Sequence, residues 1–407
     1  MSPDRMRQID HWIGVPVCWA LTVVRRARAM IVGRPARPAT PPQQVLFVEL
    51  AEMGTTVLAT PALQRLKTRN PDAEVFFLIF KHLADSVIAL GVVPAAHVFT
   101  IDASSLWTIA RDTVRFMRAA RHHRIDTAVN LEPFVRLSTI LCLLSGARRR
   151  AGFHAFMQPG LYCGRLLTHE VTYSAHLHMW QSLVTLVNAL WESPGTVPMG
   201  KTLAPGPEDL IVPTIATGES GRERIRQLVG RATSPGERLI VINPNASALL
   251  PIRKWPLDRY AGLVESLLRD PRNVCVVIGS AFERVEARFI ADRVKSDRLI
   301  DLTGRTTLSE LIDLFNVADV LVSNDSGPAQ FAALTSIHAF VFFGPETPDR
   351  YGPLSDRCVP LYARYACSPC VTAFNQRRTS CQDNVCVKHF EVETVARLVT
   401  EKLGALS

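Results

Sequence analysis

Short apolar runs recur along the second half of the chain, each followed by small or polar residues and then by a stretch with helical spacing. These runs are 239–245 (LIVINPN), 274–280 (VCVVIGS), 299–304 (LIDLTG), 320–327 (VLVSNDSG) and 339–345 (AFVFFGP). Continuous apolar runs of this length are typical of parallel strands buried on both faces. Their alternation with helical stretches predicts a doubly wound α/β domain. The pattern Thr307-Leu-Ser-Glu310 is a capping box and predicts the start of one of its helices.

The first half of the chain alternates in the same way. Apolar runs lie at 45–50, 75–80, 97–100 and 126–130, with helical spacing at 57–69 and 106–121. A length of 407 residues favours two domains. We expect an N-terminal amphipathic segment with a Pro-rich linker at 1–42, a first Rossmann-like domain at 43–205 and a connection at 206–238. A second Rossmann-like domain at 239–366 and a Cys-containing segment with a C-terminal helix at 367–407 complete the chain.

The composition narrows the class of protein. Apolar residues make up 47% and charged residues 20% of the chain, which excludes wholesale disorder and a polytopic membrane protein. The net charge of +9 favours anionic partners. Aromatic residues are only 7%, and basic stretches lack interleaved aromatics, so we expect no nucleic-acid partner. Nine cysteines, an odd number, favour a reducing cytosol.

The N-terminal segment has an uncharged stretch from Trp12 to Val24, followed by Arg25, Arg26 and Arg28. Thirteen residues are too few to cross a bilayer as a helix, and arginines after the apolar stretch are the reverse of a signal peptide. One interpretation is a helix that lies in an anionic membrane interface. The other is a helix that packs on the protein's own surface, followed by the linker GRPARPATPPQQ.

The strand ends of the second domain carry candidate binding residues, because open parallel sheets bind ligands at the carboxyl ends of their strands. Asp325, Ser326 and Gly327 follow one strand, and free N–H groups at a helix start there would favour a phosphate. Asn245 and Ser247 follow another strand and would either bind a diphosphate or form a turn.

Two further patterns offer charged groups. Arg253 and Lys254 precede a helix start at Pro256, where they would offset charge on a departing diphosphate or remain solvated. In the first domain, Glu49 and Glu52 stand in a loop before a helix. There they would act as a base that removes a hydroxyl proton or as partners of the helix dipole.

Three stretches together resemble the heptosyltransferase-type bacterial glycosyltransferases of family 9, over roughly residues 45–390. They are VLFVELAEMGTTVLATPALQRLK, RKWPLDRYAGL and NDSGPAQFAAL. The resemblance implies two Rossmann-like domains facing across a cleft, the glycosyltransferase B architecture. It also implies inverting transfer of a sugar, heptose or a related one, from a nucleotide diphosphate donor, with an ADP-linked donor favoured. The acceptor would be a lipopolysaccharide-type or other lipid-linked saccharide at the inner face of the cytoplasmic membrane, and no metal or cofactor would be required for catalysis.

The resemblance also assigns roles to residues, with the donor in the second domain and the acceptor in the first. Donor contacts would come from Asp325, Ser326, Gly327, Gln330, Asn245, Ser247 and, at the ribose, Glu283. Arg253, with Lys254, would match a cation near the phosphates. Gly54, Thr55 and Arg136 would lie on the acceptor side.

Two departures from the family pattern bear on activity. Thr55 stands where relatives carry the acidic general base, and a hydroxyl is too weak a base. We therefore expect Glu52 to act instead, with Glu49 as the fallback. Gln330 stands where relatives commonly have His, so the donor sugar could differ from heptose. The alternative is a non-catalytic nucleotide-sugar-binding relative that has lost its base and acts as a partner in envelope polysaccharide assembly.

The remaining candidates are a cysteine cluster and two basic stretches. Cys367, Cys370, Cys381 and Cys386 could hold a structural zinc, form disulfides, bind an iron–sulfur centre or be ordinary thiols. Arg148-Arg149-Arg150, with Arg121 and Arg124, would guide a phosphorylated lipid acceptor or form a solvated basic face.

Overall fold

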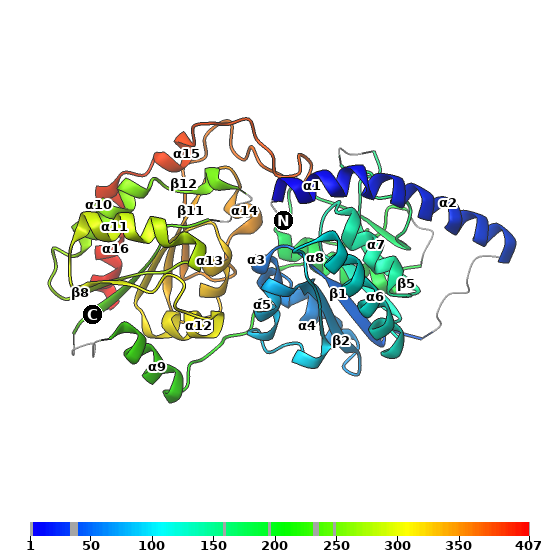
Figure 1. Ribbon diagram of the computed structural model, residues 1–407, viewed down its shortest axis with the longest axis horizontal. Helices are drawn as coiled ribbons and strands as arrows, with labels where there is room; N and C mark the ends of the chain where they lie inside the picture. Colours follow the sequence, from blue (N-terminus) through cyan, green and yellow to red (C-terminus); the bar gives the residue numbers. More distant parts are fainter. Residues whose placement is uncertain are drawn as a thin grey trace. The chain divides into compact units, whose positions relative to one another are not determined.

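The chain folds into two compact units, each built on its own six-stranded parallel sheet (Figure 1). The computed structural model describes residues 3–32, 40–157, 160–193, 197–230, 236–246 and 250–406. The first unit comprises Met1–Ile211 with Ala373–Asn375, and the second comprises Val212–Thr372 with Gln376–Ser407. The predicted α/β class, with two Rossmann-like domains, is confirmed.

The sheet of the first unit has the order β3-β2-β1-β4-β5-β6. Its strands are β1 Gln44–Val48, β2 Glu74–Phe80, β3 Val98–Ile101, β4 Thr127–Asn130, β5 Arg149–His154 and β6 His169–Thr172. The four strands predicted in this half are present, and β5 and β6 are additional. Because β1 is central, between β2 and β4, its carboxyl end lies in the middle of the sheet edge.

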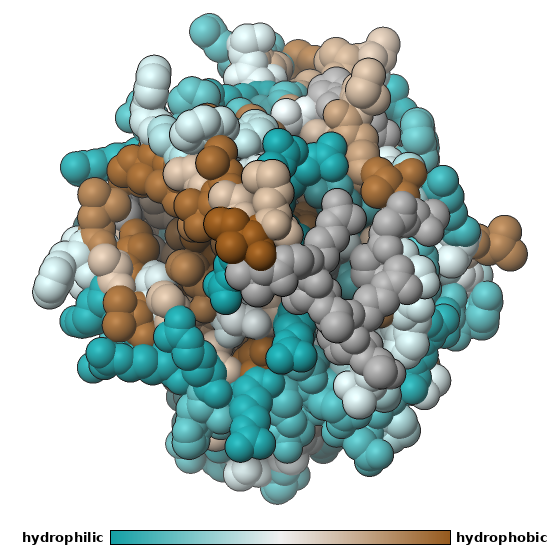
Figure 2. Space-filling model, turned by 90° about the vertical axis from the view of Figure 1, so that its right-hand side faces the viewer, coloured by the Kyte–Doolittle hydropathy of each residue, from teal (hydrophilic) through white to brown (hydrophobic). Residues whose placement is uncertain are grey.

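Two helices at the start of the chain, α1 Pro3–Trp12 and α2 Gly14–Val32, cover part of the first unit. The helix α2 contacts α7 Arg136–Leu144, with Cys18 and Thr22 buried. Figure 2 looks onto the side where α2 ends and shows hydrophobic residues gathered there, bordered by hydrophilic ones. Among the described residues, no helix has the length and apolar character needed to cross a membrane. Most of the predicted Pro-rich linker lies outside the described residues.

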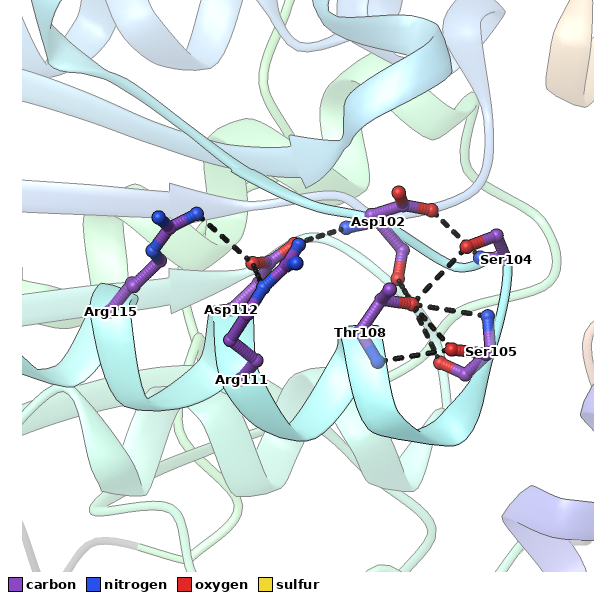
Figure 3. A network of polar contacts seen from close by, with 7 residues as sticks. All are labelled: Asp102, Ser104, Ser105, Thr108, Arg111, Asp112 and Arg115. Carbon is purple, nitrogen blue, oxygen red and sulfur yellow. Dashed lines mark hydrogen bonds and ion pairs between the residues drawn. The ribbon is translucent and has the colours of Figure 1, made fainter.

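The other helices of the first unit are α3 Met53–Leu58, α4 Thr60–Arg69, α5 Ala84–Ile88, α6 Leu106–His122 and α8 Met179–Asn188. The helix predicted at 106–121 is thus confirmed as α6, and Figure 3 shows why it begins where it does. Ser105 Oγ accepts a hydrogen bond from Thr108 N at 3.1 Å, and Thr108 Oγ1 accepts one from Ser105 N at 3.1 Å. One turn later, Asp112 accepts a hydrogen bond from Asp102 N at 3.0 Å and pairs with Arg111. The contacts between Ser105 and Thr108 satisfy donors that a helix start leaves open, and Asp112 ties the preceding loop to the helix.

The basic stretch 148–150 is mostly not a solvated face, which corrects one interpretation of it. Arg149 and Arg150 lie in β5 and are buried. Arg150 donates hydrogen bonds to Leu166 O, at 2.7 Å, and to Ala147 O. Burial and, to a smaller extent, the nearby charge of Arg25 lower its pKa to about 10. Arg149 donates to Thr40 O, so both arginines anchor the start of β5 through carbonyl groups.

The sheet of the second unit has the order β12-β11-β10-β7-β8-β9. Its strands are β7 Arg238–Asn243, β8 Asn273–Val277, β9 Leu299–Asp301, β10 Val320–Asn324, β11 His338–Phe343 and β12 Cys358–Tyr362. Its helices are α9 Glu219–Val229, α10 Leu257–Leu267, α11 Arg284–Val294, α12 Leu308–Val317, α13 Gly327–Ala332, α14 Pro348–Tyr351, α15 Val385–Lys388 and α16 Val392–Leu406. The five predicted strands are confirmed, and β12 is additional. The predicted capping box at Thr307 is present, since its hydroxyl accepts from Glu310 N at 3.3 Å.

Candidate functional site

Polar side chains of the second unit meet where β7, β8, β10 and β11 end. The central contact joins Arg253 Nη1 to Asp325 Oδ2 at 2.9 Å, with both side chains largely buried. The charges of Asp325 and Glu346 raise the pKa of Arg253 although its burial acts to lower it. The Nε of Arg253 is buried without a hydrogen-bond partner in the described part of the chain. A guanidinium held in this way has a donor left for an anionic ligand.

An amide and hydroxyl network fixes the loops around this pair. Asn243 Nδ2 donates to Ser323 Oγ at 2.9 Å and to Ser326 Oγ at 3.0 Å. Asn324 accepts a hydrogen bond from Trp255 N at 2.8 Å, and its own amide donates to the carbonyl of Asn245 at 3.2 Å. The stretch that carries Arg253 is thereby tied to the ends of both β7 and β10. Gly327, the residue after Ser326, is the first residue of α13.

Asn245 and Glu283 converge over Gly279, the second residue after β8. A Cβ placed at Gly279 would lie 2.7 Å from Asn245 Nδ2 and 3.2 Å from Glu283 Oε2. Glu283 Oε2 also accepts a hydrogen bond from Ser280 N at 2.7 Å, while Asn245 Oδ1 is buried with no partner among the residues described. Because only a hydrogen occupies the Gly279 position, backbone and both side chains could approach one ligand group.

The other residues predicted for the donor site in this unit are Lys254, Gln330 and Ser247. Lys254 does not join the Asp325 cluster but pairs with Glu286 on α11 at 3.1 Å. Gln330 is buried, and its Nε2 donates to Tyr351 O at 2.7 Å. Its Oε1 has no hydrogen-bond partner within the described ranges. Ser247 lies outside the described residues.

Glu346 is a site residue that the sequence reasoning missed. It is almost fully buried, three residues after β11, and its carboxylate lies 3.4 Å from Arg377 Nε. Burial and the neighbouring charge of Asp325 raise its pKa to about 8, although Arg253 and Arg350 act in the opposite direction. The available signal was an acidic residue right after a strand, the same placement that singled out Asp325.

In the first unit, the loop after β1 brings the carboxylate of Glu52 next to Thr55. Glu52 precedes α3, and its Oε2 accepts a hydrogen bond from Thr55 Oγ1 at 3.0 Å. Thr55 is buried, and Gly54 lies beside it in α3. The carboxylate of Glu52 and the hydroxyl of Thr55 thus share one place at the carboxyl edge of the sheet. A carboxylate there can accept a proton, which the hydroxyl alone cannot do.

Two buried carboxyl groups hold this loop. Glu49 Oε1 accepts hydrogen bonds from Ala51 N at 3.3 Å and Glu52 N at 3.1 Å, and Glu132 Oε1 accepts one from Leu50 N at 3.2 Å. A side-chain hydrogen bond also links Glu132 to Glu49, and burial raises the pKa of Glu132 to about 7. Sequence reasoning missed Glu132, although it follows the predicted strand 126–130 as Glu49 follows β1.

Arg136, predicted as an acceptor contact, is held by the protein itself. Its side chain is 3% exposed, and its Nη1 lies 2.8 Å from Asp10 Oδ2 of α1. Its Nε donates to Tyr162 O at 2.8 Å. These contacts give Arg136 an anchoring role for the N-terminal helices, and its acceptor role stays a prediction.

The four clustered cysteines do not form the predicted metal site. Across the described ranges, which include all four, no three His, Cys, Asp or Glu side chains are placed to hold a metal ion. Cys386 is buried in the core of the second unit, whereas Cys367 and Cys381 are exposed. The Sγ of Cys381 donates to Asp383 O at 3.1 Å, the Sγ of Cys370 accepts a hydrogen bond from Thr379 Oγ1 at 3.7 Å, and no disulfide joins any of these four cysteines. The zinc, iron–sulfur and disulfide interpretations are therefore not supported.

Comparisons with known proteins identify the family of the chain. The family model described as "Glycosyltransferase family 9 (heptosyltransferase)" matches residues 113–379. The chain is 26% identical over 247 residues to lipopolysaccharide heptosyltransferase 2 of Salmonella typhimurium, covering 60% of this chain. Sequence alignments with two curated relatives span only 40% and 66% of those proteins' lengths.

Solved structures show the same fold. The Escherichia coli ADP-heptose lipopolysaccharide heptosyltransferase II has a TM-score of 0.69 at 18% identity, covering 89% of this chain and 98% of that one. An Escherichia coli heptosyltransferase with ADP has a TM-score of 0.62 at 14% identity, covering 88% of this chain and 100% of that one. Since the family model matches more than half of its residues, the chain belongs to glycosyltransferase family 9, the heptosyltransferases.

Proposed function

We propose that the protein transfers a sugar, heptose or a related one, from a nucleotide diphosphate donor to a lipopolysaccharide-type or other lipid-linked saccharide. The donor nucleotide is ADP, which a solved relative of the same fold holds. The reaction takes place at the inner face of the cytoplasmic membrane, where such an acceptor is accessible. The observation that carries the proposal is the buried Arg253–Asp325 pair at the strand ends of the second unit.

The donor would bind to the polar groups around this pair. Asn245 and Glu283 converge over Gly279 and suit the ribose hydroxyls. Ser326 and Gly327 at the start of α13, with the remaining donor of Arg253, suit the diphosphate. Gln330, with one amide oxygen unpartnered, suits a sugar hydroxyl. Lys254 adds a second cation next to Arg253 in the chain, although its side chain pairs with Glu286.

Transfer then proceeds by a single displacement with inversion. The acceptor oxygen attacks the anomeric carbon, the bond from that carbon to the diphosphate oxygen breaks, and the proton of the acceptor hydroxyl passes to Glu52. Thr55 positions this carboxylate through its 3.0 Å hydrogen bond. Arg253 stabilises the negative charge of the leaving diphosphate, so that no metal is required for this step.

Thermal unfolding with ADP, UDP, GDP and CMP tests the donor site. A ligand that binds only the folded state raises the midpoint, by about 2.7 kcal/mol of stability at a hundredfold excess over Kd. We expect ADP to stabilise the wild type and to have little effect on Asp325→Ala. The variant Asp258→Ala, an exposed acid in the first turn of α10, is the matched control. Equal stabilisation of wild type and Asp325→Ala would contradict the proposed site, and binding without any turnover would indicate a non-catalytic relative.

A further inference from the structure

The two N-terminal helices are fixed on the first unit by one face. Cys18 and Thr22 of α2 are buried, and a Cβ placed at Gly164 would lie 2.8 Å from the carbonyl oxygen of Cys18. Thr22 Oγ1 accepts a hydrogen bond from Arg165 N at 3.0 Å, and Arg25 Nη1 donates to Leu167 O at 3.1 Å. This close, directional contact determines which face of α2 points outward.

A buried ion pair fixes α1 in the same way. Asp10 binds Arg136 Nη1 at 2.8 Å and accepts a hydrogen bond from Leu137 N at 3.1 Å, at the start of α7. Met6 of α1 packs against the core of the first unit. The N-terminal helices are therefore held along their inner face from Met6 to Arg25.

The outward face is apolar. Trp12, Trp19, Met30 and Ile31 are 74%, 61%, 81% and 83% exposed, and Ile13, Val23 and Val24 are also exposed. At about 100° per residue, Trp19, Val23 and Met30 of α2 project within about 40° of one another, and Val24 and Ile31 extend the sector to about 140°. Cys18 and Thr22 project on the opposite side. An exposed apolar face of this size indicates an interaction surface.

Arginines border this face on both sides. On the same projection, Arg26 lies next to Trp19 and Arg28 lies next to Val24, and both are exposed. The helix α2 has three arginines and no acidic residue, and the carboxylate of Asp10 in α1 is engaged by Arg136. Exposed tryptophans with flanking arginines suit the boundary between acyl chains and anionic headgroups, where indole rings and cations are both stabilised.

We infer that the outer face of α1 and α2 docks the protein on an anionic lipid bilayer, with Trp12, Trp19 and Met30 inserted among the lipids and Arg26 and Arg28 on the headgroups. This inference deepens the proposed function, because a lipid-linked acceptor would lie in the same surface. Figure 2 shows the side of the molecule at which α2 ends, where hydrophobic residues gather beside hydrophilic ones. A second copy of the chain would suit the apolar sector but not the arginines on both its borders.

Flotation of the full chain with vesicles tests this inference without any turnover. We expect binding to vesicles that contain phosphatidylglycerol and at least about tenfold weaker binding to vesicles of phosphatidylcholine alone, since each cation near the surface contributes about 1 kcal/mol. Trp19→Ser with Met30→Ser should reduce binding to both vesicles. Arg26→Glu with Arg28→Glu should remove the preference for phosphatidylglycerol.

The matched control is Phe282→Ser with Val285→Ser in the second unit, where the side chains are 97% and 77% exposed. We expect this variant to float as the wild type does, and all variants to keep the midpoint shift caused by ADP.

Wild-type protein that stays with the unbound fraction would overturn the inference. Flotation of the Trp19 and Arg26 double variants to the same extent as the wild type would also overturn it. A change from dimer to monomer in sedimentation of lipid-free Trp19→Ser with Met30→Ser would assign the face to a second copy instead. Loss of the ADP shift in the wild type would contradict the proposed function while leaving the lipid result intact.

Discussion

The proposed activity depends on Glu52, whose carboxylate accepts a hydrogen bond from Thr55 Oγ1. Glu52→Gln keeps the size of the side chain and its contact with Thr55 but removes the proton acceptor. We expect kcat to fall about 10²- to 10⁴-fold, with the ADP midpoint shift unchanged. Steady-state transfer from the ADP-linked sugar measures this, and a wild-type rate in Glu52→Gln would exclude Glu52 as the base.

The double variant Glu52→Gln with Thr55→Asp sharpens this test. It places a carboxylate directly at position 55, where relatives are expected to carry theirs, so we expect it to recover part of the lost kcat. Thr55→Asn in the Glu52→Gln background is the control, because it adds the same shape without a proton acceptor. Equal rates for the two double variants would mean that position 55 does not face the reacting hydroxyl.

Sequence reasoning singled out Glu52 and Asp325 because they follow strands, and Arg253 because it precedes a helix start at Pro256. It missed Glu132 and Glu346, whose importance comes from burial and from partners far away in the chain, such as the Leu50 amide and Arg377. It assigned Arg136 to the acceptor, whereas its partner Asp10 is 126 residues away. Pairings over such distances are set by tertiary structure, so an acidic residue that follows a strand does not by itself reveal its partner.

The buried Asp10–Arg136 pair lets us predict how the N-terminal helices are held. Asp10→Asn leaves Arg136 buried without its counter-ion, which is expected to cost about 3–5 kcal/mol at this contact. We expect α1 and α2 to open locally, and limited proteolysis should then cleave the N-terminal helices of the variant faster than those of the wild type. The double variant Asp10→Asn with Arg136→Met removes both charges and should lose less than the single variant, and a larger loss would contradict a direct pair.

The start of α6 gives a second prediction for a single element. Ser105→Ala removes the hydroxyl that accepts from Thr108 N, so the first unit should lose about 1 kcal/mol of unfolding free energy. Denaturant unfolding measures this loss. Ser104→Ala is the control, since its Oγ lies outside the capping box. An unchanged midpoint in Ser105→Ala would mean that the cap contributes nothing.

At the level of elements, nine strands were predicted from their apolar runs, whereas β5, β6 and β12 were not. The strand β5 begins with two arginines, which donate hydrogen bonds to carbonyl groups, and β12 contains Pro360. Both β6 and β12 are edge strands, where one side needs no partner strand and polar or proline residues are tolerated. Their pairing depends on neighbouring strands rather than on their own sequence.

For the whole molecule, two buried carboxyl groups, one in each unit, predict how stability depends on pH. The pKa of Glu132 is raised to about 7 and that of Glu346 to about 8, both mainly by burial. Between the unfolded value near 4.5 and these values, the folded protein binds more protons than the unfolded chain. The free energy of unfolding therefore falls as pH rises from about 4.5 to 8, by on the order of 1.4 kcal/mol for each unit of pKa shift.

Thermal unfolding between pH 5 and 8.5 measures this dependence, with one midpoint for each unit that unfolds separately. Glu132→Gln keeps the hydrogen bond to Leu50 N but cannot ionise, so the midpoint of the first unit should fall less steeply with pH. Glu346→Gln should have the same effect on the second unit, at somewhat higher pH. Because the two carboxyl groups lie in different units, the two effects should add in the double variant. A wild-type slope in both variants would mean that both carboxyl groups are charged in the folded protein at neutral pH. For Glu346, the attraction of Arg253 and Arg377 would then outweigh the free-energy cost of burying its charge.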